Sequence, residues 1–351
     1  MGVSHWRSIL GRRAAQFAWT LPLALLFPGC GLLIDAIEMV RPIATDEVQA
    51  ICLRHRVQIG MAAEPFRPFV FPAIWTDEGA RVTGLDVELI TQLTGALTRH
   101  CGTNITPVLH LVRFRDLFTL LNEGQLDLFV SAVAANIPSP TRAGLAYSTP
   151  YFYNGGLGGI TARADIADRI RATLRSQTNQ AAPDGLVAHE QALAGFTVAV
   201  QEWTAAHWYA EANLKASRLI LCDSLPAAFE AVADSTTPSI DIILGGEPVL
   251  EYMVKHVRKD WRLLTREDGT PLFLTRGHYA VVMAEDSYRL RWFVNNVLLR
   301  LDESGRLAAF RARWLDESYA FPRRAATEGL PFDVGKMVAH YDQGICRPAP
   351  R

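Results

Sequence analysis

The sequence predicts an α/β protein made of two similar units, each a mostly parallel sheet flanked by helices. Strand-like apolar runs alternate with segments of helical periodicity from about residue 55 to 163, and the same alternation begins again after Arg163. Strands that alternate with helices form parallel sheets whose faces the helices cover. The chain has 351 residues, of which 49% are hydrophobic, and this is enough for two domain cores.

The first unit begins with a strand at residues 56–61, which ends at a proline-rich turn. A helix runs from about Gly84 to Arg99, because apolar residues recur there at helical spacing and Asp86 is suited to cap its start. A strand, a short helix and a buried strand complete the unit, at residues 107–112, 113–125 and 126–134. Ligands of such sheets lie beyond the carboxyl ends of the strands.

The second unit repeats this order after a polar segment at residues 164–195, where two helices and a loop are expected. Strands and helices then alternate at residues 196–201, 204–214, 217–222, 225–234 and 239–246. One strand and two helices follow, at residues 279–284, 287–305 and 306–315. The tail at 318–351 contains proline, glycine and arginine without periodicity and is expected to be irregular.

Charge and motif content argue against several classes of function. The chain has 35 Lys and Arg against 36 Asp and Glu, with no basic stripe interleaved with aromatic residues, so nucleic acid is not an expected partner. There is no CxxC or HExxH motif and no cluster of histidines and cysteines. Neither a metal site nor a cofactor is therefore expected.

Residues 1–40 have the composition of an export signal. A basic segment at 1–13 precedes an apolar run that carries no charge before Asp35, the pattern of a signal peptide. The run approaches the length of a membrane span, so an uncleaved anchor is the alternative. The residues before Cys30 resemble a lipoprotein processing site, which makes Cys30 a candidate for lipidation. A periplasmic location is predicted, while cleavage, lipidation and retention as an anchor stay open.

The cysteines agree with an oxidising compartment. If Cys30 carries lipid, four of the five cysteines remain, an even number. Cys52 lies just before the first strand and Cys101 just after the first helix, two points that meet at one end of the sheet in a βαβ unit. We therefore expect a Cys52–Cys101 disulfide, and a Cys222–Cys346 disulfide follows by elimination. Buried free thiols are the alternative.

Seven segments carry a family resemblance, at residues 57–71, 84–90, 117–130, 139–152, 198–205, 240–249 and 305–315. They include GLDVELI at the start of the first helix, SPTRAGLAYSTPYF at the end of the first unit, and VAVQEWTA in the second. In this order they resemble the family 3 extracellular solute-binding proteins, the amino-acid-binding class of ABC transporters. The resemblance covers roughly residues 55–317.

The resemblance implies a two-lobed, periplasmic-binding-protein-like fold with two hinge crossovers. Lobe 1 would comprise residues 55–154 and 279–317, and lobe 2 residues 155–278. A ligand enclosed between the lobes would be presented to an ABC permease in the inner membrane by a monomeric binding protein that is not an enzyme. Two alternatives stay open: a ligand sensor without transport, and a dehydratase-like enzyme whose one evident cleft acid is Glu247.

Arg142 is the first candidate for a ligand contact. Ser139 at the N-cap and Pro140 after it favour a helix start, where unpaired backbone N–H groups attract an anion. A guanidinium group binds a carboxylate through two parallel hydrogen bonds. The resemblance implies that Arg142 binds the ligand's carboxylate. The alternative is an exposed arginine at a helix end.

Further contacts are expected from Trp203, Thr204 and Ala205, where a strand meets the next helix and can supply a second anion contact. Trp203 replaces the glycine usual in the family, so its side chain either narrows the pocket or packs outward. Phe66 stands at the family's aromatic position and either lies against the ligand or belongs to the core.

Two departures from the family concern the ligand's amine. Gly246 stands where amino-acid binders of the family have an aspartate, and Glu247 follows it. The acid that some members carry after the first strand is replaced by Ala62 and Ala63, and Glu64 follows them. An unpaired buried ammonium costs several kcal/mol. Either Glu247 or Glu64 therefore pairs with the amine, or the ligand lacks one. A small molecule with a carboxylate is the class that we expect.

Overall fold

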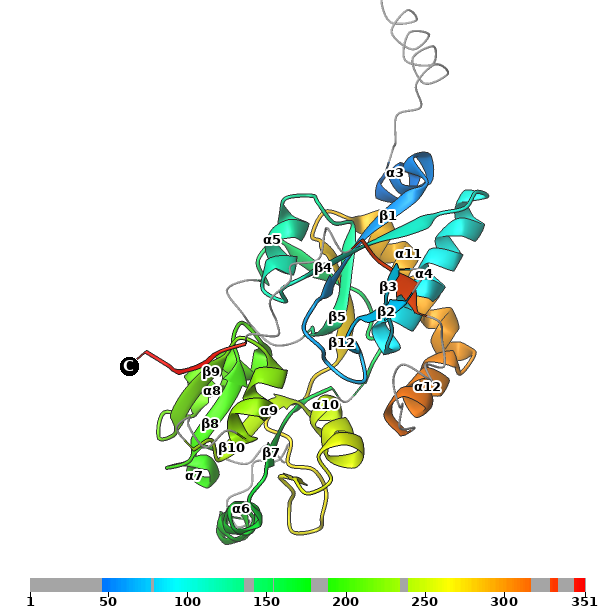
Figure 1. Ribbon diagram of the computed structural model, residues 1–351. Helices are drawn as coiled ribbons and strands as arrows, with labels where there is room; N and C mark the ends of the chain where they lie inside the picture. The colour runs from blue at the N-terminus through cyan, green and yellow to red at the C-terminus, as the bar shows by residue number, and fades with distance from the viewer. Residues whose placement is uncertain are drawn as a thin grey trace, which may run out of the picture.

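The computed structural model describes residues 46–76, 79–135, 142–153, 155–177, 189–233, 239–316, 329–333 and 344–350. Two α/β bodies, joined by crossings of the chain, make up this part of the protein (Figure 1). The export signal expected at 1–40, with its candidate lipidation site Cys30, lies outside these residues. No helix within the described ranges combines the length and the apolar character that a membrane crossing requires.

The first lobe contains a five-stranded sheet in the order β4-β1-β5-β12-β6. Its strands are β1 (Arg56–Ala62), β4 (Thr106–Val112), β5 (Leu128–Ala134), β6 (Leu145–Tyr147) and β12 (Tyr279–Ala284). β1 is parallel to β4 and β5. β12 is antiparallel to β5 and β6, because the chain enters it on its return from the second lobe.

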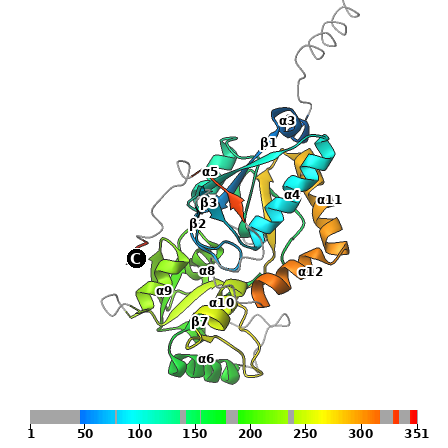
Figure 2. The ribbon, with the colours of Figure 1, turned by 45° about the vertical axis from the view of Figure 1, so that its right-hand side comes forward.

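Helices cover both faces of this sheet (Figure 2). One face packs against α3 (Glu47–Arg54), α4 (Leu85–Cys101) and α11 (Tyr288–Glu303), and the other against α5 (Asp116–Asn122). The alternation of β5 explains this, because Val130 lies in the core on the α4 side while Phe129 and Val133 lie with Leu117 of α5. α12 (Arg306–Arg311) and a π-helical turn at Ala312–Asp316 continue from α11.

The second lobe contains a six-stranded sheet in the order β11-β7-β10-β8-β9-β14. Its strands are β7 (Leu157–Thr161), β8 (Thr197–Gln201), β9 (Arg218–Cys222), β10 (Ile242–Gly246), β11 (Arg262–Leu263) and β14 (Cys346–Pro348). β8 is parallel to β9 and β10, whereas β7, β11 and β14 run antiparallel to their neighbours. The two-lobed architecture of mostly parallel central strands agrees with the prediction.

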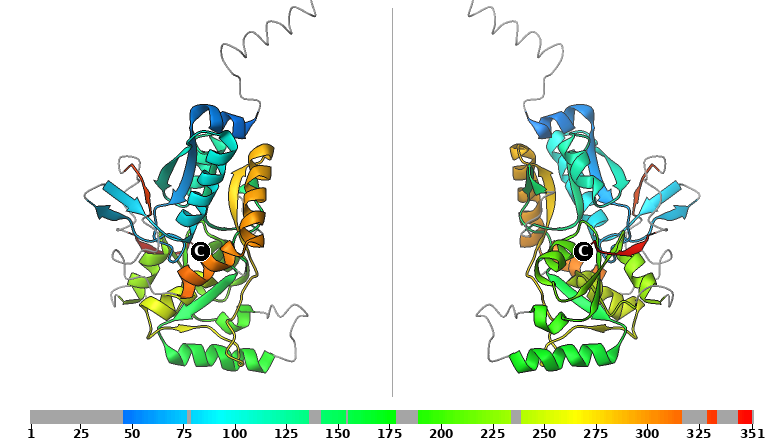
Figure 3. Two further views of the ribbon diagram at one scale, coloured as in Figure 1. Left: turned by 90° about the vertical axis from the view of Figure 1, so that its right-hand side faces the viewer. Right: turned by 90° about the vertical axis from the view of Figure 1, so that its left-hand side faces the viewer.

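The helices of the second lobe also divide between two faces. They are α6 (Ala164–Gln177), α7 (His189–Leu193), α8 (Ala205–Asn213), α9 (Leu225–Ala233), α10 (Glu247–Tyr252) and a π-helical turn at Met253–Val257. α6, α7 and α8 share one core with Val198 and Leu244, while α9 and α10 pack on the opposite face with Ala199 and Ile243. Figure 3 shows α6 along the end of this lobe far from the first.

Among the residues described between β6 and β12, two crossovers join the lobes and run side by side. The first leads from β6 to β7, and the second enters β12. Tyr279 donates its N–H to the Phe152 carbonyl at 2.9 Å and accepts one from the Tyr151 N–H at 2.9 Å, and the Gly155 N–H donates to the Gly277 carbonyl at 2.8 Å. The crossovers therefore form one hydrogen-bonded hinge, as expected for this architecture.

The tail differs from the prediction of an irregular segment. Its described parts contain β13 (Leu330–Pro331), which pairs with β3 (Gly79–Val82) beside β2 (Ile74–Thr76), and β14, which pairs with β9. Arg347 on β14 also donates from Nη2 to both carboxylate oxygens of Glu202 at 2.7 Å. Such short strands need no apolar pattern of their own, because hydrogen bonds to their partner strands hold them in place.

Disulfide bonds join both expected cysteine pairs. Cys52 at the end of α3 is bonded to Cys101 at the end of α4, across a sequence separation of 49 residues. Cys222 on β9 is bonded to Cys346 on β14, across 124 residues. The second bond attaches the tail to the second lobe, although the chain enters the tail from the first lobe.

Asp86 does not cap α4, contrary to the prediction. Gly84 is the N-cap and no side chain caps the helix. The first amides of the helix instead donate to the backbone carbonyls of Pro68 and Phe69 at 3.1 Å. The carboxylate of Asp86 is therefore free to turn into the lobe, where it accepts hydrogen bonds from the Tyr151 hydroxyl and the Ala132 N–H at 2.7 and 2.9 Å.

Candidate ligand-binding cleft

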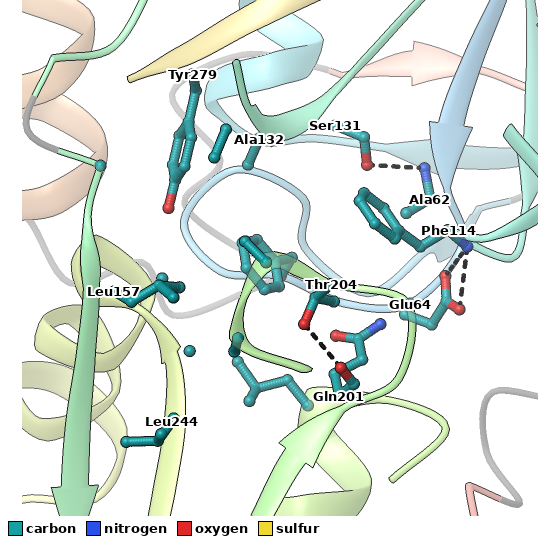
Figure 4. A pocket seen from close by; sticks show the side chains of 18 of the residues that line it. Ala62, Glu64, Phe114, Ser131, Ala132, Leu157, Gln201, Thr204, Leu244 and Tyr279 are labelled. Atoms are coloured by element: carbon teal, nitrogen blue, oxygen red, sulfur yellow. Dashed lines mark hydrogen bonds between the residues drawn. The ribbon is translucent and has the colours of Figure 1, made fainter. Parts of the chain in front are cut away.

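A cleft lies between the two sheets, at the carboxyl ends of their parallel strands (Figure 4). The space that the centre of a water molecule can reach within it measures about 60 Å³. That is several times what one water needs, so the cleft suits a small ligand. Its lining comprises Ala62, Glu64, Phe66, Phe114, Ser131, Ala132, Ala134 and Arg142 from the first lobe, Gly155, Leu157 and Tyr279 from or beside the crossovers, and Gln201, Thr204, Ala205, Ala206, Leu225, Leu244, Gly245 and Gly246 from the second.

Arg142 lines this cleft and is half-buried. Its guanidinium group donates to the Ala134 carbonyl and lies 5.8 Å from the centre of the Tyr147 ring. Burial lowers its pKa from the usual value. Among the described residues no carboxylate pairs with it. A half-buried cation without an anion is costly, and an anionic ligand would remove that cost.

The start of α8 faces the cleft from the second lobe. Thr204 is the N-cap, and its hydroxyl accepts from the His207 N–H at 3.4 Å and donates to the Gln201 carbonyl at 2.7 Å. Ala205 and Ala206 follow in the lining, and their amides have no acceptor among the described residues. The first amides of a helix carry a partial positive charge, so this end of α8 can donate hydrogen bonds to an anion.

Phe66 also lines the cleft, while Trp203 does not. Trp203 has a left-handed backbone with φ of 63°, and its ring meets Trp208 edge-on at a centroid distance of 5.9 Å. Its side chain is 38% exposed. The Trp203 side chain therefore packs outward and does not narrow the cleft, which decides between the two alternatives that the sequence left open. Ser139 lies outside the described residues.

Glu247 is also placed away from the lining. It begins α10, and its Cβ and Cγ lie against Gly158 of β7. The side chain is buried, and burial, with the nearby Glu251 adding to it, raises its pKa to about 7. Gly246, the residue before it, does line the cleft. A ligand amine in the cleft would therefore meet Gly246 rather than the Glu247 carboxylate.

Glu64 is the acid that the structure places in the cleft. Its side chain is buried, and both carboxyl oxygens accept from the Phe114 N–H, at 3.2 and 3.1 Å. Burial raises its pKa to about 7. In the described part of the chain no cluster of three or more histidine, cysteine, aspartate or glutamate residues could hold a metal ion.

Comparison with known proteins identifies the family. Residues 58–317 match the family described as bacterial extracellular solute-binding proteins, family 3. The chain belongs to this family. No curated protein matches it significantly.

Solved structures of solute-binding proteins share its two-lobed fold. An amino acid ABC transporter substrate-binding protein from Streptococcus pneumoniae bound to L-arginine has a TM-score of 0.60 and 18% identity, over 78% of this chain and 98% of that one. The ancestral amino-acid-binding protein AncCDT-1, a precursor of cyclohexadienyl dehydratase, has a TM-score of 0.59 and 19% identity, over 76% of this chain and 99% of that one. At these identities the likeness shows the fold alone.

Several cleft residues of this solute-binding protein were not singled out from the sequence. Gln201 is the last residue of β8, so its place at the carboxyl end of a parallel strand was a usable signal. Ser131 lies within β5, where its hydroxyl oxygen accepts from the Ala62 N–H at 3.2 Å. Tyr279 enters from the second crossover and is more than 30 residues away in the sequence from any other lining residue. No local pattern indicates that its side chain reaches the cleft.

Proposed function

We propose that the protein is an extracytoplasmic solute-binding protein that captures a small carboxylate-bearing ligand, an amino acid or a related compound, between its two lobes. The observation that supports this most strongly is the half-buried Arg142, which lines the cleft without a carboxylate partner among the described residues. Family membership and the amino-acid-binding neighbours support the same class of function.

The two anion contacts come from different lobes, and this is the physical basis of capture. Arg142 belongs to the first lobe, and the unpaired amides at the start of α8 belong to the second. A carboxylate that binds both is held more tightly when the lobes approach. Its binding therefore shifts the population of the hinge toward the closed form, because the open form offers one contact at a time.

The physiological setting follows from the family and from the N-terminal sequence. Residues 1–40 would direct the chain across the inner membrane, with Cys30 lipidation or an uncleaved segment holding it there. The closed, ligand-bound monomer would then be presented to an ABC permease. In this function the cleft binds its ligand without converting it.

A thermal-shift screen of the full chain tests the proposal, with amino acids, 2-hydroxy acids, 2-oxo acids and other small carboxylates as ligands. A ligand present at 100 times its Kd stabilises the folded state by about 2.7 kcal/mol. Arg142→Ala should abolish the shift. The control Arg289→Ala, on the exposed side of α11, should keep it in full. A full response from the Arg142 variant would refute the assignment.

Acid catalysis in the same cleft is a second candidate function, favoured by one observation. Glu64 lies in the cleft with its pKa raised by burial to about 7, as expected of a group that donates a proton near neutral pH. One neighbour in fold is a precursor of cyclohexadienyl dehydratase. Release of water from a cyclic hydroxy acid, abolished in Glu64→Gln, would establish this function. An unchanged ligand after prolonged incubation excludes it.

A further inference from the structure

The described lining of the cleft contains two charged side chains, Arg142 and Glu64. Both oxygens of Glu64 already accept from the Phe114 N–H. The other polar side chains of the lining are neutral, namely Ser131, Gln201, Thr204 and Tyr279. A bound anion therefore meets one cation, and the rest of the ligand meets neutral groups and apolar surface.

The Tyr279 hydroxyl fills the space that an acidic side chain at position 246 of the second lobe would need. A Cβ placed on Gly246, at the end of β10, would overlap the Tyr279 hydroxyl oxygen. A Cβ on Gly155 would lie 2.8 Å from the edge of the same ring. These two glycines thus form a slot for the phenol, and no side chain fits at 246 while it is filled.

The phenol is held rigidly in this slot. Its backbone N–H donates to the Phe152 carbonyl and its carbonyl accepts from the Tyr151 N–H, both in the first crossover. Its ring stacks on Phe152 at a centroid distance of 5.6 Å and meets Phe69 edge-on at 5.1 Å. The hydroxyl is directed into the cleft (Figure 4) and has no hydrogen-bond partner among the described residues. A rigid, unpartnered hydroxyl is suited to select a ligand group.

The amide of Gln201 offers a second neutral contact. This side chain is buried at the cleft and has no hydrogen-bond partner among the described residues. Burial raises the pKa of Tyr279, and the nearby carboxyls of Glu247 and Asp86 raise it further, so its phenol stays neutral at physiological pH. Neither of these two carboxyls belongs to the lining of the cleft. A hydroxyl or carbonyl group pairs well with such neutral donors and acceptors, whereas a buried ammonium that meets only neutral groups lacks the anion it needs.

We propose that Tyr279 is the specificity-determining residue of the cleft and that the ligand is a 2-hydroxy or 2-oxo carboxylate rather than an α-amino acid. This inference rests on the proposed function and narrows its ligand class. In it, Arg142 binds the carboxylate and the Tyr279 hydroxyl binds the neighbouring oxygen. Gly246 is the residue that makes room for that hydroxyl.

Isothermal titration of the full chain with matched ligand sets provides the test. Each set contains an L-amino acid and its 2-hydroxy and 2-oxo counterparts, with the side chains of alanine, leucine and phenylalanine. We expect the tightest binder to be an oxygen analogue, at least about 100-fold tighter than its amino counterpart. Tyr279→Phe should weaken that analogue about tenfold, because one hydrogen bond is lost while the ring packing remains.

Two further variants exclude the rival explanations. Glu64→Gln removes the one acid of the described lining. A preference for the oxygen analogue that persists in this variant supports the proposal, whereas a selective loss of amino-acid binding would assign an ammonium to Glu64 and overturn it. In Tyr279→Phe the nearest ring carbon would lie 3.6 Å from a Cβ at 246, an ordinary contact. The double variant Tyr279→Phe with Gly246→Asp should therefore shift the preference toward the amino acid. An unchanged preference would contradict the assigned role of the slot.

The outcomes separate this inference from the proposed function. If amino acids bind at least as tightly as their oxygen analogues and Arg142→Ala abolishes binding, the proposed function stands and this inference fails. If no small carboxylate of any class binds, the proposed function itself fails.

Discussion

Asp86→Asn should change how the stability of the first lobe depends on pH. The Asp86 carboxyl is fully enclosed, and this burial raises its pKa from 3.8 to about 7, against the opposing effect of its hydrogen bonds from Tyr151 and Ala132. The folded protein thus holds this proton more tightly than the unfolded chain does. The site therefore stabilises the fold most at low pH, and its contribution is lost as the pH rises from about 4 to about 7.

The size of the effect follows from the two pKa values. A pKa difference of one corresponds to 1.36 kcal/mol, so the step from 3.8 to about 7 corresponds to about 4 kcal/mol. Glu64 and Glu247 act in the same direction, because burial raises the pKa of each from 4.5 to about 7. The wild-type protein should therefore lose stability across this range, and the variant should lose about 4 kcal/mol less.

Urea unfolding followed by tryptophan fluorescence at pH 4, 5, 6 and 7 measures this difference. At pH 4 the Asp86 carboxyl of the folded wild type is already neutral, so the neutral amide should come within about 1 kcal/mol of its stability. At pH 7 the variant should be the more stable of the two. Asp302→Asn, on an exposed turn of α11, is the matched control and should follow the wild type. Equal pH dependence in the wild type and Asp86→Asn would refute the reasoning.

Three further changes test other parts of the structure. Replacing Cys222 and Cys346 by serine should lower the free energy of unfolding by about 2–5 kcal/mol, because the bond closes a long loop; an unchanged unfolding midpoint would contradict this. Trp203→Gly should relieve about 1 kcal/mol of left-handed backbone strain, and the lost contact with Trp208 should offset part of this gain. Ligand affinity should stay unchanged, and weaker binding would place the Trp203 ring in the cleft. Thr204→Ala should cost about 1 kcal/mol of stability through the lost N-cap and also weaken ligand binding, and calorimetric titration checks the second effect.

Features that are local in sequence could be predicted well. The alternation of apolar runs indicated the order of strands and helices in both lobes, because that pattern reflects which face of each element is buried. The Cys52–Cys101 pair followed from the geometry of one βαβ unit. Arg142 and Thr204 were located by the family resemblance together with helix-start signals, and both line the cleft.

Features that depend on distant partners could not be predicted in this way. The fit of Tyr279 between Gly155 and Gly246 joins three segments that meet only in the folded hinge. The carboxylate of Asp86 turned inward because backbone carbonyls had already satisfied the start of α4, which no local pattern reveals. β14 is a strand because β9 offers it an edge.

A crystal structure of the protein with its bound ligand tests the central claim most directly. We expect the ligand's carboxylate to lie between the lobes, with Arg142 donating to it at about 2.8 Å and the amides of Ala205 or Ala206 donating from the other side. A ligand held in the cleft while the Arg142 guanidinium group points into bulk solvent would contradict the account.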